Sequence, residues 1–200
     1  MNAWKQALSD WILADKYIEN KESIQISEEN EDGKARLLIL SNNKIIHLLR
    51  KDNDKIPFLA NKACADGILI EFIGNYPVAI HIVELKRTIS TKSWNTIRKQ
   101  FIGALGYTRA FLGVLGLPAP KNIHCYTAFY RDKLASRENP DPIFERPFTG
   151  VPITPETTPT LFWETRTLSI FSEEAKHHKI QWDWKEDTEH THTLSPSEHT

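Results

Sequence analysis

The feature that most constrains the fold is a change of hydrophobic period after residue 86. Residues 66–73 and 78–86 are apolar runs separated by a Gly-Asn-Tyr-Pro turn, which predicts two paired strands. From Ser93, which we expect to cap a helix, apolar side chains recur at helical spacing as far as residue 115. Residues 121–130 alternate again. This region therefore predicts the order strand, strand, helix, strand.

The segments before this region add further elements. Large apolar residues at near-helical spacing predict a helix over residues 2–20. Residues 27–34 are polar and acidic and predict a loop. The apolar runs 35–40 and 44–49, separated by Ser-Asn-Asn, predict a hairpin. With the later elements, this order indicates an α/β fold with a central mixed sheet flanked by helices.

The C-terminal part contains fewer apolar residues. Residues 139–160 include six prolines, which predicts an extended surface connection, and a late strand is expected near residues 165–171. From residue 183 onward the chain is acidic, bears histidines and has few apolar side chains. We therefore expect a single domain over residues 1–182 and a disordered tail over residues 183–200.

Composition excludes several classes of protein. The 200 residues carry 25 basic and 26 acidic side chains, and this balance excludes a chain-wide polycation. Two cysteines without a CxxC pair exclude a disulfide scaffold and a thiolate zinc cage, so a cytoplasmic location is expected. No secretory signal is recognised at the N-terminus. Residues 101–117 form the most apolar stretch, but they are too few for a membrane span and include Arg109.

Three charged side chains lie at the ends of the two paired strands. Glu84 and Lys86 project from the same face because side chains alternate along a strand, and Asp66 begins the neighbouring strand. If the strands pair near Asp66, the two carboxylates form a hard-oxygen site suited to Mg²⁺ or Mn²⁺. Lys86 would then orient or deprotonate an attacking water, or offset the charge that builds on a pentacoordinate phosphorus.

This arrangement resembles the PD-(D/E)xK nuclease superfamily, whose motif runs from an Asp on one strand to a Glu-x-Lys on the next. The resemblance covers residues 2–130 and implies a restriction-endonuclease-like core of helix, three strands, helix and strand, here with an additional N-terminal strand. It implies that Asp66 and Glu84 bind the metal and that Lys86 is catalytic. The residue before the Asp is Ala65 where the family motif has Pro.

The resemblance also implies two further members of the site. The helix after the Glu-x-Lys commonly carries a Gln or Lys in this family, and Gln100, with Lys99 beside it, occupies that helix here. Some members carry an additional acid on the first helix. Either Glu19 or Glu22 fits that description, and the sequence does not distinguish them.

The tripeptide acid-x-Lys has little specificity on its own, since it occurs five times in this chain. Only the copy at Glu84 closes an apolar strand, follows a strand that begins with Asp, and precedes a basic helix and another strand. The alternative interpretation is that Glu84 and Lys86 form a solvated ion pair at a strand end while Asp66 begins a turn.

Basic residues are concentrated next to this motif. Residues 85–131 contain eight basic side chains and no acidic one. Those nearest the motif would bind the phosphates of a nucleic acid, with salt-dependent affinity: Arg87, Lys92, Arg98 and Lys99. The alternative is a solvated helix face with scattered positive charge.

Other polar and aromatic residues are given structural roles. His81 lies on the strand face opposite Glu84 and is expected in the core. Four histidines fall in a segment expected to be unfolded, where they would bind metal weakly: His177, His178, His190 and His192. Trp163, Trp182 and Trp184 are expected to fill a core or cover a sheet edge rather than to stack on bases.

Together these patterns predict a metal-dependent nuclease that hydrolyses phosphodiester bonds of nucleic acid, with Mg²⁺ or Mn²⁺ as cofactor. The choice of DNA over RNA follows from substrate frequency in the family alone. The alternative is a noncatalytic nuclease-fold protein that binds a nucleic-acid or protein partner as an inhibitor or assembly factor. Endonuclease or exonuclease action and homodimer formation stay open.

Overall fold

The computed structural model describes residues 3–20, 23–30, 33–49, 63–134, 159–182 and 189–194. The helical segments are α1 (Ala3–Trp11), the 3-10 turn η1 (Ala14–Lys16), α2 (Thr91–Val114) and α4 (Pro159–Glu164). The strands are β1 (Tyr17–Asn20), β2 (Ser23–Asn30), β3 (Gly33–Leu40), β4 (Lys44–Leu48), β5 (Gly67–Ile73), β6 (Tyr76–Ile89), β7 (Asn122–Asp132), β8 (Thr167–Ile170), β9 (Glu173–Gln181) and β10 (Glu189–Thr193).

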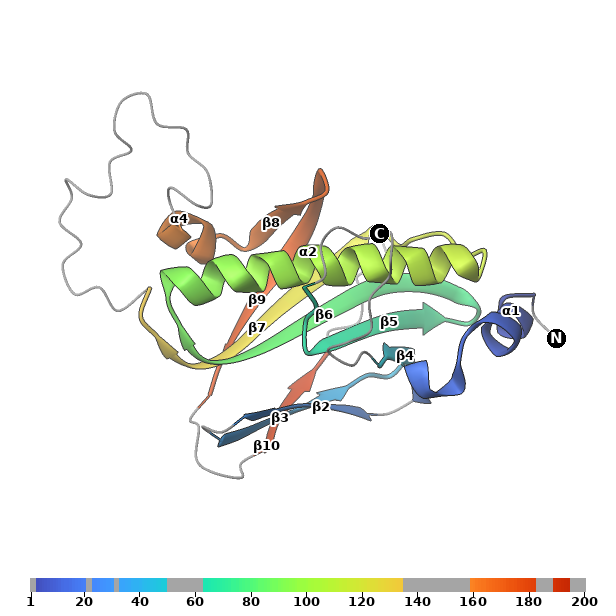
Figure 1. Cartoon of the computed structure of the whole chain (residues 1–200), viewed down its shortest axis with the longest axis horizontal. Coiled ribbons are helices and arrows are strands. Elements are labelled where there is room, and N and C mark those ends of the chain that lie inside the picture. The colour runs from blue at the N-terminus through green and yellow to red at the C-terminus, as the bar shows by residue number, and fades with distance from the viewer. Residues whose placement is uncertain are drawn as a thin grey trace.

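The main sheet contains seven strands in the order β1-β4-β5-β6-β7-β9-β8. Strands β4, β5 and β6 are antiparallel neighbours. Helix α2 then carries the chain back along the sheet, so β7 runs parallel to β6 (Figure 1). The predicted order of strand, strand, helix and strand is thus confirmed, as is the α/β class with a central mixed sheet.

Helix α2 lies along one face of the main sheet. Its N-cap is Ser90, whose hydroxyl accepts from the backbone N–H of Ser93, while the Ser93 hydroxyl accepts from the backbone N–H of Ser90. This reciprocal capping box starts the helix earlier than the predicted cap at Ser93. Trp94, Ile97 and Phe101 are fully buried in the cluster that includes the β5 and β6 side chains facing α2. Packing against the sheet thus holds this glycine-containing helix.

The opposite face of the main sheet is covered by a small sheet of three strands in the order β10-β3-β2 (Figure 1). An apolar layer between the two sheets includes Ile26, Leu37, Leu69 and Val83. The predicted hairpin of 35–40 with 44–49 is therefore wrong. Strand β3 pairs with β2 and β10, whereas β4 pairs with β1 and β5, because the Ser-Asn-Asn break carries the chain from one sheet to the other.

Other sequence expectations also need correction. The helix predicted over residues 2–20 ends at Trp11, and η1 and β1 follow because the segment at Tyr17 gains backbone hydrogen bonds from β4. The loop predicted over residues 27–34 belongs largely to β2 and β3, which pair with each other in register. Local polarity is overridden by this cross-strand pairing.

The C-terminal segment also differs from expectation. Residues 189–193, expected to be disordered, form β10, which pairs in parallel with β3. Buried Leu194 follows it, so a few anchoring side chains and backbone pairing suffice to fix this segment. Residues 183–188 and 195–200 lie outside the described residues, as does nearly all of the proline-rich stretch 139–160. The late strand expected at 165–171 is β8, and no described helix is both long and apolar enough to cross a membrane.

Candidate functional site

Asp66 and Glu84 lie side by side where β5 begins. Strands β5 and β6 pair with Gly67 opposite Val83, so Asp66 comes next to Glu84 in the antiparallel register. Strand β6 continues past this point to residue 89. There the backbone N–H of Leu85 donates to Asp66 Oδ2 at 2.7 Å. This hydrogen bond fixes the Asp66 carboxylate against β6.

Glu84 belongs to the face of the main sheet that packs against α2. Ile82, two residues before it on β6, is buried in the cluster that contains the apolar side chains of α2, and side chains alternate along a strand. Asp66 lies in the bend before β5 and reaches the same place through its hydrogen bond to the Leu85 N–H. The two strands thus bring together two acids that are 18 positions apart in the sequence.

Glu84 is a fully buried carboxylate whose second oxygen is left without a hydrogen bond from the described residues. Its side chain is 0% exposed, and Oε1 lies 2.6 Å from Lys86 Nζ. Oε2 is also buried and has no hydrogen-bond partner among the described residues. Burial and, next, the neighbouring Asp66 carboxylate raise the pKa of Glu84 to about 8, although Lys86 acts in the opposite direction. Lys86 therefore compensates only part of the cost of ionising Glu84 at this place.

Lys86 lies among several carboxylates. Its Nζ is 2.6 Å from Glu84 Oε1 and 3.8 Å from Oε1 of Glu28, which comes from β2 of the small sheet. Burial lowers the pKa of Lys86, but the charge and hydrogen bond of Glu84, with the charges of Asp66 and Glu28, outweigh burial and raise it. Lys86 is therefore an ammonium at neutral pH in the absence of another cation.

Gln100 connects α2 to the segment that leads into β5. Its Nε2 donates to the backbone carbonyl of Cys64 at 3.1 Å, two residues before Asp66. Its Oε1 is buried and has no hydrogen-bond partner among the described residues. The structure thus brings Gln100 to the border of the site, where it fixes the approach to Asp66 and presents an acceptor oxygen.

The basic residues expected to bind phosphates do not all share one surface. Arg87 is exposed on β6 next to the site, and Lys92 and Lys99 are exposed on α2. These two lysines are seven positions apart, so they lie on one helix face. Arg98 is partly buried and lies beside Leu168 of β8. Arg87, Lys92 and Lys99 are therefore more accessible to a polyanion than Arg98.

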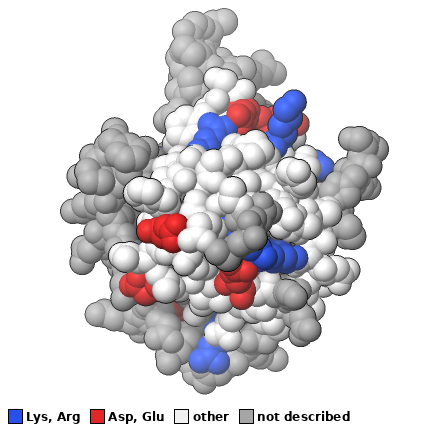
Figure 2. Space-filling view, turned by 90° about the vertical axis from the view of Figure 1, so that its right-hand side faces the viewer, with Lys and Arg blue, Asp and Glu red and all other residues white. Residues whose placement is uncertain are grey.

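Among the described residues, the surface at the end of the molecule that carries α1 and the β5–β6 turn has few charged side chains. Figure 2 shows this end, where uncharged surface predominates and charged side chains are scattered. Trp11 and Tyr76 are largely exposed in these elements. Helix α2 and the end of β6 meet at the other end of the main sheet (Figure 1).

The additional acid expected from the N-terminal segment does not come from Glu19. Glu19 lies on edge strand β1 and pairs with Lys44 of β4, which separates β1 from β5. Glu22 lies outside the described residues. Glu28 is instead the acid that reaches Lys86. Its strand was expected to be a loop, so the sequence contained no signal for this contact.

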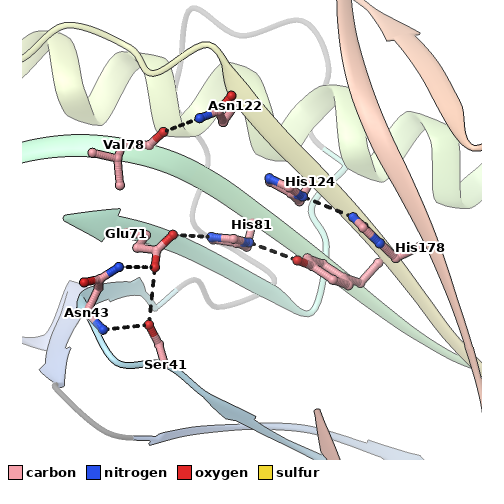
Figure 3. A network of polar contacts seen from close by, with 9 residues as sticks. Ser41, Asn43, Glu71, Val78, His81, Asn122, His124 and His178 are labelled. Atoms are coloured by element: carbon pink, nitrogen blue, oxygen red, sulfur yellow. Dashed lines mark hydrogen bonds and ion pairs between the residues drawn. The ribbon is translucent and has the colours of Figure 1, made fainter. Parts of the chain in front are cut away.

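A second buried carboxylate, Glu71, lies on the opposite face of the main sheet (Figure 3). Glu71 Oε1 accepts from Asn43 Nδ2 at 2.8 Å and from Ser41 Oγ at 3.4 Å, and Oε2 is 3.3 Å from His81 Nε2. His81 Nδ1 is in turn 3.1 Å from the Tyr126 hydroxyl. Burial raises the pKa of Glu71, but the hydrogen bonds from His81 and Asn43 outweigh it and lower that pKa. His81 lies three positions before Glu84 on the strand and was expected on the opposite face, in the core. It is buried there, as expected.

Histidines from three strands extend this network. His124 Nδ1 lies 3.1 Å from His178 Nε2 (Figure 3), and the His192 ring meets the Tyr126 ring edge-on with 5.4 Å between centroids. Burial and then neighbouring imidazoles lower the pKa of His124 and His178 to about 4. The expectation that His177, His178, His190 and His192 lie in an unfolded tail is wrong, because they belong to β9 and β10.

The donor set at Asp66 and Glu84 fits a hard divalent cation that keeps part of its own ligand shell. Within the described ranges, no three His, Cys, Asp or Glu side chains form a metal-binding group. Two carboxylates would leave coordination positions for water and for a phosphate oxygen, which is how Mg²⁺ is often bound. The buried, unpartnered Glu84 Oε2 supplies a specific reason for a cation at this place.

Comparison with known proteins identified no relative of this chain. No protein-family model matches the chain, and neither the curated proteins nor the solved structures gave a significant match. Function must therefore be inferred from the motif and from the geometry of the site.

Proposed function

We propose that this chain is a metal-dependent nuclease with a restriction-endonuclease-like core. The order of α1, β4, β5, β6, α2 and β7, with three antiparallel strands followed by a parallel one, is consistent with the core that the PD-(D/E)xK resemblance implies. The motif residues Asp66, Glu84 and Lys86 lie together at the junction of β5 and β6. Fold and motif thus support the same proposal independently.

The observation that carries the proposal is the state of Glu84. A fully buried carboxylate whose pKa is raised to about 8, beside a second carboxylate, is costly unless a cation compensates it. Lys86 contacts only one of its two oxygens. Strongly perturbed carboxylates of this kind are typical of functional sites.

The chain's own residues supply the remaining parts of a hydrolytic site. Asp66 and Glu84 would hold Mg²⁺ or Mn²⁺, which when bound acts as a Lewis acid on the phosphate. Lys86 would orient the attacking water and stabilise charge on the phosphate oxygens. Gln100 would position the segment before Asp66. The water oxygen bonds to phosphorus and releases a proton to solvent, the bond to the leaving sugar oxygen breaks, and that oxygen takes up a proton from solvent.

The proposed substrate is nucleic acid, and the proposed location is the cytoplasm. Arg87, Lys92 and Lys99 offer positive charge near the end of β6 and along α2 for a phosphate backbone. DNA is preferred over RNA because of the family resemblance, and the geometry of the protein does not contribute to that choice.

The direct test combines metal binding with cleavage. Calorimetry with Mg²⁺ and Mn²⁺ should give binding to the wild type and none to Asp66→Asn, which keeps an acceptor for the Leu85 N–H. Glu19→Gln, which removes an exposed acid on β1, is the matched control and should bind metal normally. Cleavage is then measured on plasmid DNA, linear DNA, single-stranded DNA and RNA. Absence of metal binding to the wild type would contradict the proposal.

A noncatalytic nuclease-fold binder is the second candidate, and one observation favours it. Lys86 already compensates one Glu84 oxygen at 2.6 Å, as a structural ion pair would. A protein of this kind would bind nucleic acid or a protein partner without a metal requirement. Salt-dependent nucleic-acid binding that is equal in wild type and Asp66→Asn, without metal-dependent cleavage, would support this candidate over the nuclease.

A further inference from the structure

The small sheet contributes a side chain to the site that the motif does not include. Glu28 Oε1 of β2 is 3.8 Å from Lys86 Nζ, and both side chains are about three-quarters buried, with 22% and 23% exposed. Its negative charge also contributes to the raised pKa values of Glu84 and Lys86. Glu28 therefore lies within electrostatic range of both motif residues.

The approach of β2 to this place is fixed by a packing contact beside Asp66. A Cβ added to Gly67 would come within 2.2 Å of Ile26 Cδ1, so Ile26 occupies the space that a larger residue at position 67 would fill. Ile26 is 1% exposed, and Glu28 is two residues further along the same strand face. The glycine after Asp66 thus allows β2 to approach closely and to place Glu28 near Lys86.

Among the described residues, Lys86 forms ion pairs with two carboxylates, Glu84 and Glu28, and only Glu84 belongs to the proposed metal site. Glu84, at 2.6 Å, is the nearer partner in the absence of a divalent cation. When a cation binds Asp66 and Glu84, the attraction of Glu84 for the ammonium weakens because the same carboxylate now neutralises the metal. Glu28 then becomes the carboxylate that retains Lys86 in the site.

We propose that Glu28 is a positioning residue that holds the Lys86 ammonium in place when a divalent cation occupies Asp66 and Glu84, which makes the small sheet a functional part of the site. This inference rests on the proposed metal-dependent function. Glu28 acts through Lys86 and does not itself ligate the metal. The substrate phosphate would then meet an ammonium whose position is fixed from the small sheet.

The test measures the accessibility of Lys86 rather than activity. Lysines of the full chain are acetylated for short times with and without Mg²⁺, and modification of Lys86 is quantified by peptide mass spectrometry. In the wild type, Mg²⁺ should leave the rate of modification nearly unchanged. In Glu28→Gln, Mg²⁺ should raise that rate by about fivefold, in line with the loss of a partly exposed ion pair.

Two further variants isolate the effect of position. Glu28→Asp keeps the charge but withdraws the carboxylate by one methylene, and it should also give Mg²⁺-dependent modification of Lys86. Glu19→Gln removes a carboxylate from β1 that pairs with Lys44, and it should behave like the wild type. Circular dichroism and thermal unfolding establish that each variant is folded.

Calorimetry separates the possible failures. Mg²⁺ affinity should be the same in the wild type and in Glu28→Gln. A marked loss of affinity in Glu28→Gln would make Glu28 a metal ligand and overturn the positioning role. Normal Mg²⁺ binding with no change in Lys86 modification in either Glu28 variant would also overturn it. No Mg²⁺ or Mn²⁺ binding to the wild type would instead refute the proposed function, and the inference with it.

Discussion

Glu71 and Glu84 are both buried carboxylates of the main sheet, but the protein treats them in opposite ways. Glu71 is 1% exposed and receives hydrogen bonds from side chains on both of its oxygens (Figure 3). Glu84 is 0% exposed, is contacted by Lys86 on one oxygen, and has Asp66 beside it. The pKa of Glu71 is lowered, whereas that of Glu84 is raised to about 8.

The difference separates a structural from a functional use of buried charge. The hydrogen bonds to Glu71 compensate its desolvation, so the network with His81 and Tyr126 stabilises the contact between the two sheets. Glu84 is left incompletely compensated, which costs stability in the metal-free protein. A residue kept at such a cost is a candidate for binding something that the chain itself does not supply.

The largest expected difference between the two faces is in catalysis. Glu84→Gln and Lys86→Met should each lower kcat/KM for nucleic-acid cleavage by at least about 10²-fold, as loss of a charge-stabilising group does. Glu71→Gln should leave cleavage unchanged, because Glu71 lies on the other face of the sheet. The measurement is steady-state cleavage with Mg²⁺ at a temperature where all three variants are folded. Normal activity in both site variants would assign the cleavage to another site or to a contaminant.

A divalent metal ion should stabilise the protein by binding at Asp66 and Glu84, and not at Glu71. Mg²⁺ at about 100 times its Kd should raise the free energy of unfolding by about 2.7 kcal/mol, because only the folded state has the site. Removal of the metal with a chelator should reverse this gain. Asp66→Asn should abolish it, and Glu71→Gln should retain it. Thermal unfolding over a series of Mg²⁺ concentrations gives the comparison, and equal stabilisation of all variants would contradict it.

The same substitution should change metal-free stability in opposite directions at the two positions. Glu71→Gln should destabilise the fold by about 1–3 kcal/mol, because buried donors lose a charged acceptor. Glu84→Gln should stabilise it by about 1–2 kcal/mol at pH 8, because a carboxylate with a raised pKa is replaced by a neutral amide. Urea unfolding of the wild type and both variants measures these shifts. Destabilisation by both substitutions would indicate that Glu84 and Lys86 form a structural ion pair.

The smallest effect, taken per pH unit, is expected in the pH dependence of stability. Folded Glu84 retains its proton up to about pH 8, whereas its ordinary pKa is 4.5, so its contribution to stability decreases as the pH rises between these values. The slope cannot exceed about 1.4 kcal/mol per pH unit for one group. His124 and His178 act in the opposite direction. Because their pKa values are about 4 instead of 6.5, the protein loses stability as the pH falls through that interval. Unfolding in urea at pH 5, 6, 7 and 8 should show that Glu84→Gln removes the decrease at pH 7 and 8. Its stability should also rise more steeply from pH 5 to 6 than that of the wild type, because Glu84 no longer offsets the histidines.

The sequence predicted best those elements whose signals are local. The strands around the Gly74 turn, helix α2 and strand β7 were predicted within a few residues, because a change of hydrophobic period is visible in neighbouring positions. Alternation also placed Glu84 and Lys86 on one face and His81 on the other. The turn required a positive φ, which Gly74 adopts at 61°.

The sequence predicted poorly those elements whose stability comes from distant partners. The second half of β2 was predicted as part of an acidic loop, yet Ile24 and Ile26 earlier in the strand are buried and β3 pairs along its length. Strand β10 looked disordered for the same reason, since its parallel partner β3 lies about 150 positions earlier in the sequence. The contact of Glu28 with Lys86 depends on that misread region and could not be anticipated.

The sequence by itself determined the order of the central elements and the shared face of Glu84 and Lys86, because period and alternation are properties of neighbouring residues. The tertiary structure alone decided that Glu84 is buried and incompletely compensated, that Glu71 is compensated, and that Glu28 reaches Lys86. Burial and compensation depend on which distant segments cover a given face, and those segments are selected by the packing of the whole chain.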